Sequence, residues 1–287
     1  MVRIFWEAAR PKTLGAGVVC VLVGTAAAGR FIAWRFAAAL LASVAVQVAV
    51  NYANDYFDAV KGVDTPQRTG PRRVTAAGLV TPAQMRLAIA LALAVASVPG
   101  LALAAAIGPQ VIVVGTLCFA AALGYSGGPK PFASLGLGEV FVFVFFGVVG
   151  TVGAAYVQTR HLTALAFAVA VPVGVLAAEI LLANNIRDID TDAAAGKRTM
   201  AVRIGRNRAT ALFTGGILAT FAGTAAIAAG FHKLWALIAL ASLPLALGPV
   251  RLVRTRSDGA GLIRALVGTA RLQLVYGILL AVGLWIS

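Results

Sequence analysis

Nine apolar segments, each near the length that spans a lipid bilayer, divide this chain and constrain its fold more than any other feature. They cover residues 13–29, 36–53, 85–107, 111–125, 137–157, 162–183, 210–230, 234–253 and 266–286. A bilayer core is crossed by about 20 apolar residues in a helix, and an isolated span must satisfy its own backbone hydrogen bonds. We therefore expect an all-α polytopic membrane protein with nine transmembrane helices around a central cavity, built as a single domain over residues 1–287.

The charged residues support this class and give an orientation. Only 12% of residues are charged and 60% are hydrophobic, although the net charge is +14. If the N-terminus is placed on one side and the spans alternate, twenty Lys and Arg residues fall on that side and four on the other: Arg30, Arg35, Arg160 and Lys233. Because basic loops stay in the cytoplasm, we expect a cytoplasmic N-terminus and a lipid bilayer as the partner, with no nucleic acid. The Ala-, Gly-, Val- and Arg-rich composition favours a multi-pass protein of a bacterial plasma membrane.

Acidic residues concentrate in two short stretches at the ends of apolar segments. The chain has ten Asp and Glu residues, and six of them lie within residues 51–64 and 184–192: Asp55, Asp58, Asp64, Asp188, Asp190 and Asp192. Carboxylates at the ends of membrane helices are costly and indicate a functional site.

Each stretch forms a polar stripe if the preceding helix continues through it. The first stripe recurs at i, i+3 and i+4 and contains Gln47, Asn51, Asn54, Asp55 and Asp58. The second places Asn184, Asp188 and Asp192 at i, i+4 and i+8. Two facing stripes of oxygen ligands suit Mg²⁺, which binds a few carboxylates together with substrate phosphates. The alternative is a solvated helix end, where the carboxylates only pair with Lys61, Arg68, Arg187 and Lys197.

Basic residues follow each stripe and fit a phosphate-bearing substrate. They are Lys61, Arg68, Arg72 and Arg73 after the first, and Lys197 and Arg198 after the second. Fixed cations would stabilise the charge that builds on a departing diphosphate. Ordinary cytoplasmic topology explains the same residues without a ligand.

These motifs resemble those of a known family. Asn51-x-x-x-Asp55-x-x-Asp58 with Asp188-x-x-x-Asp192 is similar to the paired aspartate motifs of UbiA-type intramembrane aromatic prenyltransferases. Finer matches resemble the branch that acts on 1,4-dihydroxy-2-naphthoate in menaquinone synthesis, and they lie at residues 9–14, 54–58, 61–65, 68–71, 125–129, 135–139, 184–192 and 196–199. One departure concerns Asp64, which lies six residues after Asp58 rather than the four often seen in the superfamily.

The resemblance implies a reaction and a set of roles. In that branch an isoprenyl diphosphate loses diphosphate, the prenyl chain replaces the carboxylate of 1,4-dihydroxy-2-naphthoate, and CO₂ and demethylmenaquinone are released. Asn51, Asp55 and Asp58 would form one Mg²⁺ site and Asp188 and Asp192 the other, the four aspartates being catalytic. The remaining substrate-binding residues would be Lys61, Arg68, Lys130 and Lys197 at the diphosphate, Arg10 and Lys12 at the acceptor carboxylate, and Asn54, Tyr125, Asn184 and Asn185 within the matched motifs.

Other functions share some of these features. Superfamily members that use 4-hydroxybenzoate or homogentisate share the aspartate motifs and the basic residues, and the choice of aromatic acceptor depends on few residues. A cation transporter would place carboxylates near the bilayer midplane, whereas here they lie at one interface beside basic loops. A CDP-alcohol phosphotransferase requires an Asp-Gly-x-x-Ala-Arg signature, which the sequence lacks. Glu139 and Glu179, at or inside apolar segments, have no assigned role.

Overall fold

The computed structural model describes residues 1–62, 70 and 72–287, and the regular structure within them is helical. Asp64, whose spacing departs from the superfamily pattern, and Arg68, a predicted substrate contact, lie outside the described residues. Seven described segments are long and apolar enough to cross a membrane. They are α3 (Ala33–Val60), α4 (Pro82–Ile107), Gly138–Thr159, α8 (Ala164–Arg187), α10 (Met200–Gly230), Leu234–Thr255 and α12 (Gly259–Ile286).

Two shorter apolar helices, α2 (Gly15–Ala27) and α5 (Gln110–Gly124), complete the bundle. Within the described residues, each predicted apolar segment therefore coincides with a helical segment, although only seven reach the length of a full span. Short helices lie outside the bundle or cap it: α1 (Val2–Ala8), η1 (Pro11–Thr13), η2 (Phe132–Leu135) and α9 (Ile189–Ala194).

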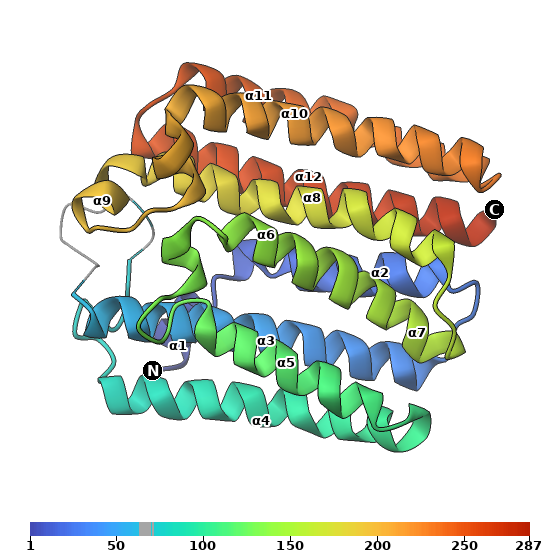
Figure 1. The fold of residues 1–287 in the computed structure, drawn as a ribbon, viewed down its shortest axis with the longest axis horizontal. Helices are drawn as coiled ribbons and strands as arrows, with labels where there is room; N and C mark the ends of the chain where they lie inside the picture. Colours follow the sequence, from blue (N-terminus) through green and yellow to red (C-terminus); the bar gives the residue numbers. More distant parts are fainter. Residues whose placement is uncertain (63–69, 71) are drawn as a thin grey trace.

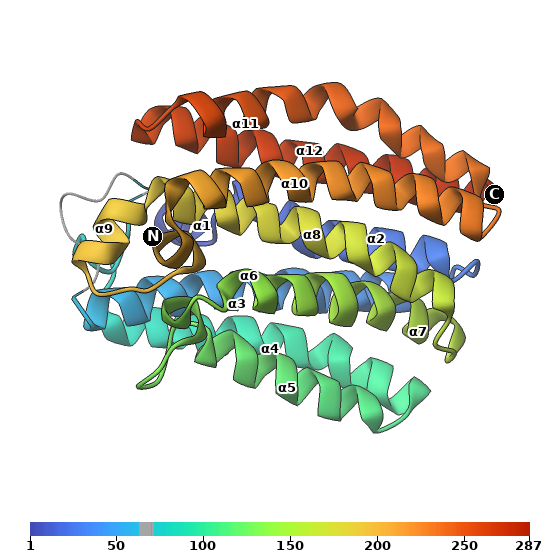
Figure 2. The same cartoon turned by 45° about the horizontal axis from the view of Figure 1, so that its top comes forward.

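The long helices run side by side along the longest axis of the molecule (Figure 1). The α9 helix and the C-terminal end of α3 lie at one end of the bundle, and the C-terminus lies at the other (Figures 1 and 2). The C-terminal ends of α3 and α8, which carry the two aspartate stretches, therefore lie at the same end of the bundle.

One predicted span is built from three helical pieces. It begins as α6 (Gly138–Val142), continues as the π-helical η3 (Phe143–Val152) and ends as α7 (Gly153–Thr159). A Cβ on Gly147 would lie 2.8 Å from both the carbonyl oxygen of Ala170 and the Cα of Gly174 on α8. The glycine thus allows two backbones to touch, as small residues do between membrane helices.

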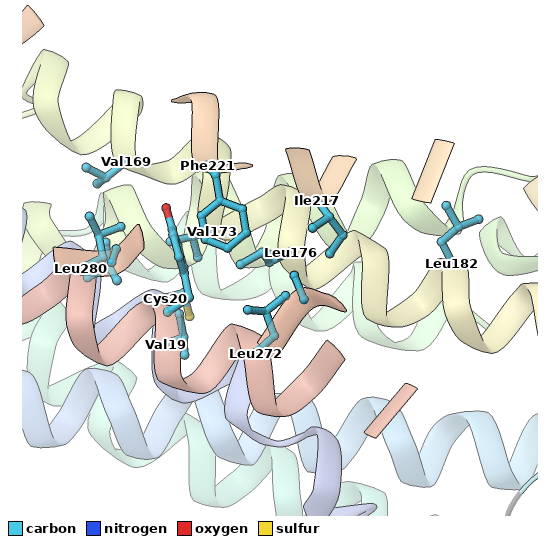
Figure 3. Close-up of a cluster of buried hydrophobic side chains, with 14 of the residues drawn as sticks. Val19, Cys20, Val169, Val173, Leu176, Leu182, Ile217, Phe221, Leu272 and Leu280 are labelled. Atoms are coloured by element: carbon cyan, nitrogen blue, oxygen red, sulfur yellow. The ribbon is translucent and has the colours of Figure 1, made fainter. Parts of the chain in front are cut away.

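The main apolar core holds α8 in place. Figure 3 shows buried side chains of α2, α8, α10 and α12 packed together, including Val19, Cys20, Val173, Leu176, Ile217, Phe221, Leu272 and Leu280. A buried hydrogen bond of 2.7 Å joins the hydroxyls of Thr224 on α10 and Tyr276 on α12. The α8 helix packs on this core along its length, as far as Ile186 in its last turn, and polar contacts of Asn185 and Arg187 add to this packing.

Candidate active site

A cavity of about 890 Å³ lies between the helices and is walled mainly by apolar side chains. Its lining comes from α3, α4, α5, η3, α8 and α12, together with the N-terminal segment. Where α3 and α8 end, the lining turns polar, and we call this the polar end of the cavity. Its main polar residues are Arg10, Lys12, Asn51, Asn54, Arg73, Tyr125, Asn184 and Arg187.

The first motif lies on one buried face in the last turns of α3, as its spacing predicts. Asn51, Asp55 and Asp58 are 8%, 2% and 4% exposed. The amide nitrogen of Asn51 donates a hydrogen bond of 2.8 Å to the carbonyl oxygen of Ala9, which fastens the N-terminal segment beside the motif. The helix continues to Val60, so the stripe is a real helical face.

The carboxylate of Asp55 is hydrogen-bonded to backbone groups that precede α4. Its two carboxylate oxygens accept the backbone N–H groups of Val74 and Thr75, at 3.1 and 2.9 Å. Such charge-assisted bonds are strong. In this state Asp55 therefore holds the connection to α4 against the motif.

Asp58 lies at the meeting point of two basic side chains. Its Oδ2 is 3.2 Å from Nη2 of Arg73 and 3.0 Å from Nζ of Lys197. Arg73 also donates to Oδ1 of Asn54 at 3.5 Å. Since Lys197 follows the second motif in sequence, this ion pair joins the two halves of the chain.

The second motif is tied together by its own arginine. Nε and Nη2 of Arg187 donate to the two oxygens of Asp188 at 2.7 and 2.6 Å. Nη2 also donates to Oδ1 of Asn184 at 2.9 Å. Asp188 and Arg187 are nearly fully buried, so this planar fork is shielded from water.

The second stripe is not one continuous helix. The helix α8 ends at Arg187, Asp188 leaves helical geometry with φ −96° and ψ 9°, and α9 begins at Ile189. The i, i+4, i+8 stack through Asp192 is therefore interrupted at its middle member, and Asp192 lies half-buried on α9.

The remaining predicted site residues fall into two groups. Those that line the cavity are Arg10, Lys12, Asn54, Tyr125 and Asn184. Those that do not are Lys61, Lys130, Lys197 and Asn185. Lys61 donates to the carbonyl oxygens of Ser126 and Gly128 at 2.8 and 3.0 Å, and burial lowers its pKa.

Two cavity residues were not among the predicted ligands. Arg73 and Arg187 both line the cavity and each lies on a motif carboxylate. The sequence counted Arg73 among the basic residues that fit a phosphate-bearing substrate, without choosing it over its neighbours, and Arg187 only as a partner of the carboxylates. Arg187 carried a usable signal, since it stands three residues after Asn184 and so shares its helix face.

The donor set at this end suits a hard cation. Asn51, Asp55, Asp58, Asp188 and Asp192 offer oxygen atoms, which Mg²⁺ prefers. Asn51 lines the cavity, whereas the four aspartates lie behind its lining, with Asp58 and Asp188 paired to the lining residues Arg73 and Arg187. Among the described residues, no three His, Cys, Asp or Glu side chains form a group that could hold a metal ion by themselves. A metal held here would therefore need amide or substrate phosphate oxygens as well, as is usual for Mg²⁺.

Comparison with known protein families identifies the fold. Residues 17–284 match the model of the UbiA prenyltransferase family. The chain belongs to this family. The apolar cavity with a basic and acidic end is thus the cavity of a UbiA-family protein.

Its relatives extend over nearly the whole chain. A protein of Mycobacterium tuberculosis named 1,4-dihydroxy-2-naphthoate octaprenyltransferase is 40% identical over 276 residues, which is 95% of this chain and 94% of the relative. A solved UbiA homolog of Aeropyrum pernix K1 has a TM-score of 0.70 at 19% identity and covers 95% of this chain and 97% of its own. A UbiA homolog of Archaeoglobus fulgidus, solved bound to DMAPP and Mg²⁺, has a TM-score of 0.64 at 17% identity, with coverage of 97% and 99%.

Proposed function

We propose that this UbiA-family protein transfers a polyprenyl group from an isoprenyl diphosphate to 1,4-dihydroxy-2-naphthoate, giving demethylmenaquinone in its hydroquinone form (demethylmenaquinol), diphosphate and CO₂. The observation that carries the proposal is the cavity itself: a basic and amide-rich end opens into a volume of about 890 Å³ with apolar walls. An isoprenyl diphosphate is divided in the same way, because it has a charged diphosphate head and a long apolar tail. The mycobacterial relative supports the choice of acceptor.

The chemistry is an aromatic substitution that balances without an oxidant when its product is the hydroquinone, demethylmenaquinol; a separate two-electron oxidation gives demethylmenaquinone. The C–O bond of the allylic diphosphate breaks and both electrons leave with the diphosphate. The ring carbon that bears the carboxylate bonds to the allylic carbon. The electrons of the ring–carboxylate bond then return to the ring as CO₂ departs.

The basic residues of the polar end would receive the diphosphate. Arg73 and Arg187 already face the cavity while they neutralise Asp58 and Asp188. Lys197, from the other half of the chain, also pairs with Asp58. Preorganised cations at the leaving group stabilise the charge that develops there.

Mg²⁺ would be held by Asn51, Asp55 and Asp58 on one side and by Asp188 and Asp192 on the other. When bound, the metal would supply charge neutralisation at the diphosphate oxygens. The donors fit it in type, and the Mg²⁺-bound Archaeoglobus homolog of similar fold supports the assignment. Asp55 and Asp188 would first have to exchange partners, since both oxygens of each are hydrogen-bonded.

The allylic cation needs surroundings that exclude water. Tyr125, Phe141 and Phe145 line the cavity, and aromatic faces also attract a cation. The rings of Phe141 and Phe145 stack with centroids 5.8 Å apart, which fixes their orientation. The acceptor would bring its carboxylate to Arg10 and Lys12, which line the same cavity.

The orientation that fits this function places both motifs and the N-terminus in the cytoplasm, with nine membrane passes in a bacterial plasma membrane. Seven long apolar helices and two shorter ones among the described residues support this number of passes. Water-soluble naphthoate and the diphosphate head would then reach the polar end from the cytoplasm, and the prenyl tail would stay in the membrane.

The test is a product assay with purified protein in liposomes. It contains a long-chain isoprenyl diphosphate, Mg²⁺ and either 1,4-dihydroxy-2-naphthoate, 4-hydroxybenzoate or homogentisate. We expect Mg²⁺-dependent demethylmenaquinol, detected as demethylmenaquinone after oxidation in air, with release of CO₂ from the first acceptor only. Product from another acceptor would overturn the naphthoate assignment and keep the prenyltransferase. No product from any acceptor, in folded protein, would favour cation transport.

A further inference from the structure

The connection between α5 and α6, together with the first two residues of α6 (residues 125–139), touches the chain beside both motifs. Lys61, just after the first motif, donates to the carbonyl oxygens of Ser126 and Gly128. The backbone N–H of Arg198, just after the second motif, donates to the carbonyl oxygen of Ser134 at 3.2 Å. We call residues 125–139 the brace.

The brace also reaches the second motif from the other side. Nδ2 of Asn185 donates to Oε1 of Glu139 at 2.8 Å, and this hydrogen bond is buried. Glu139 is 6% exposed and Asn185 7% exposed. The brace therefore holds the chain before Asp188, through Asn185, and after it, through Arg198.

This contact turns Asn185 away from the substrate cavity. Asn184 and Arg187 line the cavity on the same helical turn, whereas Asn185 and Glu139 do not. In an α-helix the side chains of residues one apart point about 100° from each other. Fixing Asn185 outward on the brace therefore fixes the direction in which Asn184 and Arg187 face inward.

This hydrogen bond adds to the other contacts of the last turn of α8. The helix ends at Arg187 and Asp188 leaves helical geometry, so α9 does not continue the axis of α8. The apolar core reaches this turn at Ile186, whose carbonyl oxygen accepts from Nη2 of Arg206 at 3.3 Å. A buried hydrogen bond from another helix is a directional constraint that apolar packing does not provide.

We propose that Glu139 and Asn185 are positioning residues: their hydrogen bond sets the rotation of the last turn of α8 and thereby aims Asn184, Arg187 and Asp188 at the diphosphate of the prenyl donor. This inference depends on the proposed function, because it names the donor site. Neither residue contacts the substrate. Their replacement acts on donor binding through the second motif.

Variants of two buried glutamates, Glu139 and Glu179, can distinguish a positioning role of the hydrogen bond from a general role in folding. Glu179 lies two turns earlier on α8, is 4% exposed, and does not line the cavity. Glu139→Leu and Asn185→Leu break the contact, Glu139→Gln keeps an oxygen that accepts from Asn185, and Glu179→Leu is the matched control. For each detergent-purified variant we would measure the thermal midpoint without ligand and the dissociation constant for inorganic diphosphate with Mg²⁺.

Loss of a residue that orients metal or substrate ligands weakens binding by about 10- to 100-fold. We expect roughly tenfold weaker diphosphate binding in Glu139→Leu and Asn185→Leu, with the double variant no worse than either. Glu139→Gln should stay within about twofold of the natural protein, and Glu179→Leu should leave binding unchanged. In the product assay the KM for the donor should rise more than kcat falls.

Two results would overturn the inference and leave the proposed function standing. One is a lowered midpoint in Glu139→Leu with unchanged diphosphate binding, which would make the pair structural only. The other is equal weakening in Glu139→Leu and Glu139→Gln, which would show that the hydrogen bond is not the operative feature. If the natural protein bound no diphosphate with Mg²⁺, both the inference and the proposed function would be wrong.

Discussion

Replacing Asp55 by Asn should release the chain between α3 and α4 even when no metal or substrate is present. The carboxylate of Asp55 accepts two backbone N–H groups, from Val74 and Thr75, and is 2% exposed. An amide side chain has one oxygen, so Asp55→Asn keeps one neutral hydrogen bond and turns an NH₂ group toward the second N–H.

The size of the effect follows from these two bonds. Hydrogen bonds to a charged group contribute about 1.5–3 kcal/mol each, and a neutral one about 1 kcal/mol. Losing two of the former and keeping one of the latter costs roughly 3 kcal/mol. Because 1.4 kcal/mol corresponds to a factor of ten, local opening should become about 100-fold more frequent.

Hydrogen exchange measures this directly. The amides of Val74 and Thr75 are the donors, so a peptide covering residues 72–80 should exchange about 100-fold faster in Asp55→Asn, measured with a metal chelator present. Asp190→Asn, at an exposed carboxylate in the second stretch, is the control and should exchange like the natural protein. Unchanged exchange in Asp55→Asn would refute the reasoning, because Asp55 would then have no structural role apart from a metal.

Three further predictions concern the motifs and the bundle. Arg187→Lys retains the charge but loses the fork to the neighbouring carboxylate, so kcat/KM should fall about 10- to 100-fold in steady-state assays; unchanged kcat/KM would mean that charge alone suffices. Lys197→Met removes the ion pair of 3.0 Å with Asp58, so donor KM should rise about tenfold; an unchanged KM would remove Lys197 from the diphosphate site. Gly147→Ala places a methyl group against the backbone of α8, where a Cβ would lie 2.8 Å from a carbonyl oxygen, and should destabilise the protein by about 1–3 kcal/mol in unfolding assays. Gly153→Ala, where a Cβ would meet nothing within 4 Å, is its control, and equal effects in both would contradict the packing argument.

The sequence determined the helical segments and the place of the motifs, because both depend on local periodicity. Apolar runs predict helices whatever their neighbours, and spacing of three and four residues puts Asn51, Asp55 and Asp58 on one face. The structure confirms that face in α3. The prediction failed at Asp188, where α8 ends, because the apolar pattern does not mark a turn inside a polar stretch.

Only the tertiary structure decided which partners meet at the site. Lys197 reaches Asp58 across 139 positions of sequence, and Asn185 reaches Glu139 across 46. Two adjacent asparagines look equivalent in the sequence, yet Asn184 faces the cavity and Asn185 faces the brace. Such choices depend on how separate helices pack and on which buried polar groups must satisfy one another, and no periodicity within one segment contains that information.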